Sequence, residues 1–474
     1  FCGVAFAAAP VYQPNWESLK QHPVPEWLMD AKFGIYAHWG VYSVPAFANE
    51  WYARRMYDPK DPKGTYEHHR KTWGPQEKFG YKDFVPMFKA EKFNPEEWSE
   101  IIRQSGARYA GIAVIHHDGF GLWKSKVNRW NAGEMGPRRD LYGDLVKALR
   151  SKSLKIIATE HHMRTFGWYL PAKPYLEQAR KANLDLFDAK YADFYWNQFT
   201  STKAQFVAQW KDKLFEVIDN YRPDVLWFDG GDFQSEDVVN AVTSTLAHYY
   251  NRGSSVEVLN KFAGNKQFNF PREFGMLTFE AGRDRPPEVD RPWIDDLSIG
   301  KNSWGYIQDL QLQDAGETIR GFVDRVSRGG GLLLSLAPTA AGEIPPDQRA
   351  FLREMGDWLK VNGEAIYGTR PWKVHAEGDT QKLIVQRGKF TAWQFAGTTA
   401  EDIRFTQKGG RVYAIALGWP PDGKLRIKSV TTAPKRVSML GAAAPVKWSH
   451  AAEGLVVEMP SRQPCKYAYA LRIE

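Results

Sequence analysis

Short apolar runs alternate with longer amphipathic segments along the first three-quarters of the chain. The runs, rich in β-branched and aromatic residues, cover 33–37, 109–115, 154–159, 225–228, 256–259, 276–279 and 331–336. The segments between them have helical spacing of apolar residues, as at 95–105, 144–151, 204–220, 237–251 and 315–327. Continuous apolar strands that alternate with helices are typical of a parallel sheet covered on both faces. Seven such strands, with no G-x-G-x-x-G after the first, predict an α/β fold with a (β/α)8-like barrel rather than a doubly wound sheet.

The pattern changes after Trp372. Short alternating stretches lie at 382–386, 390–395, 412–417, 424–430, 436–439, 455–459 and 466–473, with turn residues such as Gly409-Gly410 between them. This arrangement predicts a C-terminal antiparallel β-sandwich. Because a helical segment at 348–361 closes the first unit, we expect a catalytic barrel over 11–361 and the sandwich over 362–474.

The first ten residues, FCGVAFAAAP, are apolar and end in small residues before a polar stretch. This is typical of the rear half of a secretory signal with an A-x-A-like cleavage site, so we expect residues 1–10 to be a signal remnant and the protein to be exported, periplasmic or extracellular. A plain apolar N-terminus is the alternative. Cys2 and Cys465 fit neither a disulfide framework nor a metal-ligand spacing. Whether Cys2 is lipidated stays open.

The charge and the aromatic content of the chain limit the kinds of binding partner that can be expected. The 63 basic and 55 acidic side chains leave a net charge of +8, without blocks of like charge, so no nucleic-acid partner is expected. No apolar run is long enough to predict a membrane span. The 19 Trp, 21 Tyr and 27 Phe often stand beside polar residues, which slightly favours a carbohydrate site over a plain aromatic core.

Polar residues follow five of the apolar runs directly. They are His38, His116-His117, Glu160-His161-His162, Asp229 and Glu280. In an α/β barrel the carboxyl ends of the strands meet on one face, where catalytic groups lie. A single residue of this kind is more often a helix cap, but five together predict one polar cleft.

Two kinds of chemistry fit such a cleft. Three adjacent pairs, His68-His69, His116-His117 and His161-His162, suggest a zinc hydrolase. Neighbouring residues on a strand point to opposite faces, so each pair is expected to give at most one ligand per site, and H-E-x-x-H is absent. We therefore expect no metal and no cofactor. The favoured alternative is a carboxylate pair that acts on a glycosidic bond, with Asp229 in a glycine-bounded turn as the nucleophile.

Several motifs then point to a known family. In order they are YAHWGVYSVP at 36–45, NEWY at 49–52, HHDGF at 116–120, WFDG at 227–230, NSWGY at 302–306, a proline-bounded stretch at 338–345 and NGEAIYGTRPW at 362–372. Over about residues 15–372 the chain resembles the α-L-fucosidases of glycoside hydrolase family 29. The resemblance implies a retaining exo-glycosidase with a barrel followed by a β-sandwich. It implies hydrolysis of terminal α-L-fucosyl linkages in fucosylated oligosaccharides or glycoconjugates.

The resemblance also implies residue roles. It makes Asp229 the nucleophile, and Glu280 is our choice of acid/base. The rival acids are Glu160, Glu273, Glu288 and the pair Asp295-Asp296. The expected fucose contacts are His38, Glu50, Trp51, His116, His117, His161 and Trp227.

Three departures limit how far the family's residue roles carry over, and one of them is Glu160-His161 on the third strand, where many members have a Tyr. Where the family often has Asn-Asp-Arg, this chain has Asn260-Lys261, and lysine does not supply the planar fork of arginine. The family's Asn before Gly-Pro is replaced within 334–338, a change interpreted as structural. A fucose-like sugar such as galactose, or a non-catalytic fucose-binding protein, remain alternatives. The linkage, the acceptor, any preference for sulfated or branched glycans and the oligomeric state stay open.

Overall fold

The computed structural model describes residues 11–262, 267–387 and 389–474. Eight parallel strands close into a barrel in chain order, with β8 pairing back onto β1. They are β1 (Phe33–Ala37), β2 (Tyr109–Ile115), β3 (Lys155–Glu160), β4 (Val225–Phe228), β5 (Glu257–Lys261), β6 (Met276–Glu280), β7 (Trp293–Ser298) and β8 (Gly330–Leu336). The predicted fold class is confirmed.

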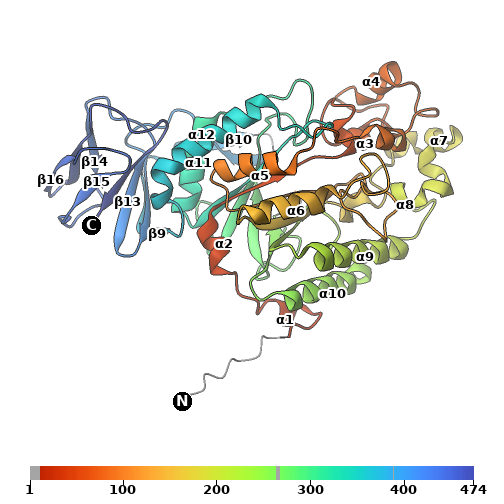
Figure 1. Ribbon diagram of the computed structural model, residues 1–474, viewed down its shortest axis with the longest axis horizontal. Helices are drawn as coiled ribbons and strands as arrows, with labels where there is room; N and C mark the ends of the chain where they lie inside the picture. The colour runs from red at the N-terminus through yellow and green to blue at the C-terminus, as the bar shows by residue number, and fades with distance from the viewer. Residues whose placement is uncertain (1–10, 263–266, 388) are drawn as a thin grey trace, which may run out of the picture.

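Amphipathic helices cover the outside of the barrel (Figure 1). The long ones are α5 (Pro95–Gln104), α6 (Leu141–Ser151), α9 (Lys203–Tyr221), α10 (Glu236–Arg252), α11 (Ala315–Ser327) and α12 (Pro346–Asn362). The shorter ones are α1 (Trp16–Leu19), α2 (Glu26–Ala31), α3 (Tyr52–Arg55), α4 (Thr65–Thr72), α7 (Lys173–Lys181) and α8 (Ala192–Tyr195). Local chemistry sets their ends, since Asn94 accepts the N–H groups of Glu96 and Glu97 and so caps α5. In the described part of the chain, none of these helices has the length and apolar content of a membrane span.

The sequence predicted seven barrel strands and missed β7. This strand contains two adjacent carboxylates, Asp295 and Asp296, which interrupt its apolar run. Both are buried, and each has a partner on another element. Asp295 pairs with Arg325 of α11 at 2.7 Å, and Asp296 accepts a hydrogen bond of 3.0 Å from the Tyr36 hydroxyl. Such long-range partners make the strand possible, but its sequence alone does not show them.

The C-terminal part is antiparallel. Its strands are β9 (Arg370–Glu377), β10 (Ile384–Arg387), β11 (Phe390–Trp393), β12 (Ile403–Lys408), β13 (Arg411–Ala416), β14 (Lys424–Ile427), β15 (Val437–Met439), β16 (Lys447–Ala451), β17 (Gly454–Glu458) and β18 (Tyr469–Ile473). A five-stranded sheet, β15-β18-β13-β12-β9, packs on the three-stranded sheet β14-β17-β16 around a shared apolar core. The predicted β-sandwich is therefore present, although β9, β12 and β16 were missed.

The hairpin β10–β11 forms a separate two-stranded sheet and reaches the barrel. The backbone N–H of Thr391 donates to Asp284 at 3.1 Å, and the Trp393 indole donates to the carbonyl of Arg285 at 3.3 Å. Both partners lie in the loop that follows β6. A segment of the C-terminal part is thus held beside the end of a barrel strand. The domain boundary at 361 stays a prediction, and the expected signal remnant at 1–10 lies outside the described residues.

Candidate active site

A polar cavity of about 300 Å³, called the cleft below, lies at the carboxyl ends of the barrel strands. All nine residues that the sequence predicted for the site line it: His38, Glu50, Trp51, His116, His117, His161, Trp227, Asp229 and Glu280. The other lining residues are Tyr36, Arg164, Gly230, Lys261, Arg283, Asp296 and Trp304. The face on which these side chains converge is the one that α/β barrels use for catalysis.

Asp229 lies one residue beyond β4, where its backbone N–H donates to the carbonyl of Glu160 at 2.9 Å. Its carboxylate accepts a hydrogen bond from the ammonium group of Lys261. On the other oxygen, the ring nitrogens of His117 and His161 lie at 3.2 Å and 3.6 Å. Burial alone would raise the pKa of Asp229, but Lys261 and the hydrogen bond from His117 hold it well below its usual value. The carboxylate is therefore ionised and ready to act as a nucleophile.

Glu280 is the last residue of β6. Its Oε2 lies 2.7 Å from the Lys261 ammonium nitrogen, and its Oε1 pairs with Arg283. Burial would raise the pKa of Glu280, yet Lys261 and Arg283 lower it below its usual value. Because Asp229 and Glu280 each contact the same nitrogen, their nearest oxygens lie within roughly 6 Å of each other. This upper limit includes the about 5–5.5 Å between the carboxyl groups of retaining glycosidases and is shorter than the about 6.5–9.5 Å of inverting ones.

Three of the rival acids lie away from the cleft. Glu273 pairs with Lys20 at 3.2 Å and is 63% exposed, and Glu288 is also exposed. Glu160 is buried, and its carboxylate accepts the backbone N–H groups of His162 and Met163. Burial raises the pKa of Glu160 to about 8, so it is a protonated internal group.

The Asp295-Asp296 pair divides between two environments. Asp295 points outward from the barrel, where Arg325 binds it. Asp296 lines the cleft, and its Oδ2 has no hydrogen-bond partner among the described residues. Burial raises the pKa of Asp296 well above its usual value, so it is neutral. With only 1% of its surface exposed it lies at the floor, whereas 21% of the Glu280 side chain is exposed toward incoming substrate.

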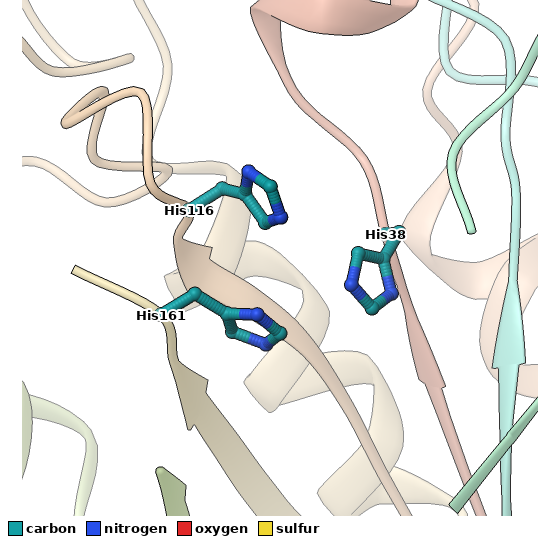
Figure 2. A group of neighbouring side chains, drawn as sticks. All are labelled: His38, His116 and His161. Atoms are coloured by element: carbon teal, nitrogen blue, oxygen red, sulfur yellow. The ribbon is translucent and has the colours of Figure 1, made fainter. Parts of the chain in front are cut away.

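Figure 2 shows His38, His116 and His161, whose imidazole rings extend into one space from beyond β1, β2 and β3. One nitrogen from each ring lies within 4.8 Å of the others. Burial lowers the pKa of His38 to about 3 and those of His116 and His161 well below the usual value. The rings are therefore neutral, and each offers a donor or an acceptor to a sugar hydroxyl.

The same nitrogens have the chemistry of metal ligands. Neutral imidazoles bind transition metals, and a second set, His117, His161 and Asp229, has comparable spacing. The Nδ1 of His38 lies 2.8 Å from the Ser335 hydroxyl, which leaves its Nε2 for a sugar hydroxyl or a metal.

Each candidate ligand set takes one member of a histidine pair, as predicted, but the alternation argument does not describe the pair His116-His117. His116 and His117 both line the cleft because β2 ends at Ile115, so the pair lies in the following turn, where alternation does not apply. His162, by contrast, turns away from the cleft and accepts a hydrogen bond of 2.9 Å from Lys213. The pair His68-His69 lies on α4 and does not line the cleft.

Aromatic rings and a buried carboxylate form the rest of the cleft wall. Glu50 accepts hydrogen bonds from the backbone N–H of Trp304 at 3.0 Å and from the Ser303 hydroxyl at 3.2 Å. The Lys261 ammonium lies 5.2 Å from the centre of the Trp227 ring. These rings give the cleft apolar surfaces beside its charged groups, as a sugar with C–H faces and hydroxyl edges requires.

Several residues in or beside the cleft were not assigned a site role from the sequence, among them Lys261, Arg164, Arg283, Trp304 and Ser335. Lys261 ends β5, so it carries the same strand-end signal as the other residues, but as a lysine in place of an arginine it was not predicted to contact the substrate. Ser335 occupies the position interpreted as structural, yet its hydroxyl contacts the His38 ring. No local signal marks Arg164, which lies in the 3-10 helix η3 (Met163–Thr165), or Arg283, which lies in the turn after β6.

The chain is similar to known proteins over nearly its whole length. The family model Alpha-L-fucosidase matches residues 3–364, and the model Alpha-L-fucosidase C-terminal domain matches 396–474. An alpha-L-fucosidase of Branchiostoma floridae is 34% identical, over 98% of this chain and 96% of its own. The tissue alpha-L-fucosidase of Homo sapiens is 33% identical, over 98% and 91%. A crystal structure of Thermotoga maritima alpha-fucosidase in complex with fucose has a TM-score of 0.77 at 28% identity, covering 98% of this chain and all of that one. The chain therefore belongs to the α-L-fucosidase family, glycoside hydrolase family 29.

Proposed function

We propose that this protein is a retaining exo-α-L-fucosidase that hydrolyses terminal α-L-fucosyl linkages of glycans. The observation that carries the proposal is the pair of carboxylates, Asp229 and Glu280, which bind one ammonium group, Lys261, inside a histidine- and tryptophan-lined cleft. Their separation suits double displacement rather than direct attack by water. The similarity to α-L-fucosidases supports fucose as the sugar that the cleft binds.

In the first step, Asp229 attacks the anomeric carbon of the fucosyl group. Glu280 gives its proton to the glycosidic oxygen, the bond between that oxygen and the anomeric carbon breaks, and the acceptor leaves as an alcohol. The product is a fucosyl ester of Asp229. Glu280 must carry a proton at this moment, and because Lys261 and Arg283 lower its pKa, acidic conditions favour the competent form.

In the second step, the ionised Glu280 removes a proton from water. The resulting oxygen attacks the anomeric carbon, the ester bond to Asp229 breaks, and the carboxylate is restored. Two inversions give net retention. Atoms and charge balance without a cofactor, and the neutral His38, His116 and His161 act as hydroxyl partners.

The direct test is turnover of a 4-nitrophenyl α-L-fucoside by wild type and by Asp229→Asn, which keeps the side-chain volume and removes the charge. Asp237→Asn, a change at an exposed carboxylate on α10, is the matched control. We expect turnover by wild type and the control only. Binding of fucose without turnover by wild type would favour a non-catalytic protein, and preferred turnover of a galactoside would favour the fucose-like alternative.

Export is a separate proposal. The apolar residues 1–10 with their Ala-rich end support it, and they lie outside the described residues. Fractionation of the cells that make the enzyme, with N-terminal sequencing of the mature protein, tests it. We expect the enzyme outside the cytoplasm with its N-terminus near residue 10, and an enzyme confined to the cytoplasm would contradict export.

A further inference from the structure

A second polar cavity of about 300 Å³ adjoins the cleft. The two cavities share Glu50, Arg283 and Trp304 as lining residues. The second cavity is completed by the loop after β7, which includes Lys301, and by Arg387 of the hairpin β10–β11. It thus combines side chains from the barrel and from the C-terminal part.

The second cavity lies beside Glu280, the general acid of the proposed mechanism. Ala281, directly after Glu280, lines it, and Arg283 in its wall pairs with the Glu280 carboxylate. A general acid must touch the oxygen that leaves with the acceptor. We therefore expect the sugar attached to that oxygen to extend past Glu280 and Arg283 into the second cavity.

Its charge is strongly one-sided. Arg283, Lys301 and Arg387 contribute three cations, and Lys301 and Arg387 are exposed. Among the described residues that line the second cavity, Glu50 is the one acidic side chain, and its carboxylate already accepts the hydrogen bonds from Ser303 and Trp304. Lys301 and Arg387 are therefore the cations exposed to an incoming ligand, since Arg283 is already paired with Glu280, and guanidinium forks bind sulfate and carboxylate groups well.

The elements that carry these cations are braced. The hairpin bearing Arg387 is tied to the loop after β6 through Thr391 and Trp393. The backbone N–H of Lys301 donates to the carbonyl of Gln311 at 2.7 Å. Because the backbone that carries these cations is held in place, less conformational freedom is lost when a ligand binds. This favours a specific subsite over a diffuse surface charge.

We propose that the second cavity is an acceptor subsite for an anionic sugar, one that carries a sulfate ester or a carboxylate next to the terminal fucose. This inference rests on the proposed function and names its substrate class.

The test compares kcat/KM for four substrates: a 4-nitrophenyl fucoside, a neutral fucosyl disaccharide, and the same disaccharide bearing a sulfate or a carboxylate on the acceptor. The variants are Lys301→Gln, Arg387→Gln and their combination. Lys147→Gln, an exposed charge removal on α6, is the control for net charge. Thermal unfolding verifies that each variant is folded.

For wild type we expect at least one anionic disaccharide to exceed the neutral one by about ten-fold, mainly through KM, with the advantage shrinking at high salt. In each single variant the ratio of kcat/KM between the anionic and the neutral disaccharide should fall by about three-fold, which is the size expected for a partly exposed ion pair. In the double variant most of the advantage should be lost. The control should keep it. Which anionic substrate is preferred identifies the group.

Equal kcat/KM for all three disaccharides would overturn the subsite. So would an advantage that survives in the double variant, or one that falls equally in the Lys147→Gln control. Failure of the proposed function gives a different result, because then even the aryl fucoside is not hydrolysed.

Discussion

The ammonium nitrogen of Lys261 lies 2.7 Å from Oε2 of Glu280. The same group donates to Asp229, so one cation joins the nucleophile to the general acid/base. Burial would lower the pKa of Lys261, but the two carboxylates raise it further above its usual value, so it stays charged. Lys261 is therefore a positioning residue that holds both carboxylates together and favours their ionised forms.

Replacing Lys261 with methionine should shift both limbs of the pH profile of kcat/KM to higher pH. The acidic limb reports ionisation of Asp229 and the basic limb loss of the Glu280 proton, and Lys261 lowers both pKa values. Activity at the optimum should fall by about 10²-fold or more, because the two groups lose their common anchor.

Two companion variants make that profile specific. Arg283→Gln should raise only the basic limb, because Arg283 pairs with Glu280. Lys261→Arg, which keeps the charge, should leave both limbs near their original pH. An unchanged profile in Lys261→Met would contradict the electrostatic role of Lys261.

Glu280→Ala should show a strong dependence on the leaving group. A poor leaving group needs its proton, so hydrolysis of a natural disaccharide should fall by about 10²–10⁴-fold. An activated phenol departs unaided, so with that substrate the fucosyl intermediate should accumulate and a burst should appear. Asp296→Asn, at the cleft floor, should lack this contrast. If Asp296→Asn showed it and Glu280→Ala did not, the acid role would pass to Asp296.

Exhaustive chelation should leave kcat/KM unchanged. His38, His116 and His161 have spacing that would suit a metal, but the proposed mechanism uses them as neutral hydroxyl partners. The measurement pairs a dialysed, chelator-treated sample with an untreated one, followed by addition of Zn²⁺. Loss on chelation with recovery by Zn²⁺ would show that the histidines hold a catalytic metal.

Asp324→Ala should destabilise the fold by about 3–5 kcal/mol, since it leaves buried guanidinium groups uncompensated. Asp324 on α11 accepts hydrogen bonds from Arg404 of β12 at 2.6 Å and from Arg328 at 3.1 Å, which joins the barrel to the sandwich. Urea unfolding gives the free energy. Asp422→Ala, which breaks an exposed pair with Arg426, is the control and should change it little.

The pH dependence of that stability has a defined sign. Burial would raise the pKa of Asp324, but Arg404 and Arg328 lower it to about 2. The contribution is therefore fully present above the unfolded value of about 3.9 and is lost as the pH falls toward 2. The difference in free energy of unfolding between wild type and Asp324→Ala should therefore become smaller over that interval. A difference that grows in acid would contradict the stabilising role of the ionised Asp324.

The features that could be predicted from the sequence are those that depend on the local pattern of apolar and polar residues. Strand-end residues such as His38 and Asp229 follow apolar runs, so the barrel and its catalytic face could be inferred together. The strand β7 could not, because Asp295 and Asp296 look like loop residues until Arg325 and Tyr36 are placed beside them.

Contacts between residues that are distant in the sequence could not be predicted from it either. The bridge from Lys261 to Glu280 depends on the pairing of β5 with β6, and Arg387 reaches the second cavity only because its hairpin docks on the barrel. Long-range packing decides such contacts, and spacing along the chain does not record it.

Covalent trapping tests the central claim most directly. A 2-fluoro-fucosyl fluoride slows release of the ester, so the intermediate should persist long enough for proteolysis and peptide mass spectrometry. The account predicts one fucosyl adduct per protein, located on Asp229, and none in Asp229→Asn. An adduct on another carboxylate, or turnover of an aryl fucoside without inactivation and with inverted product, would contradict it.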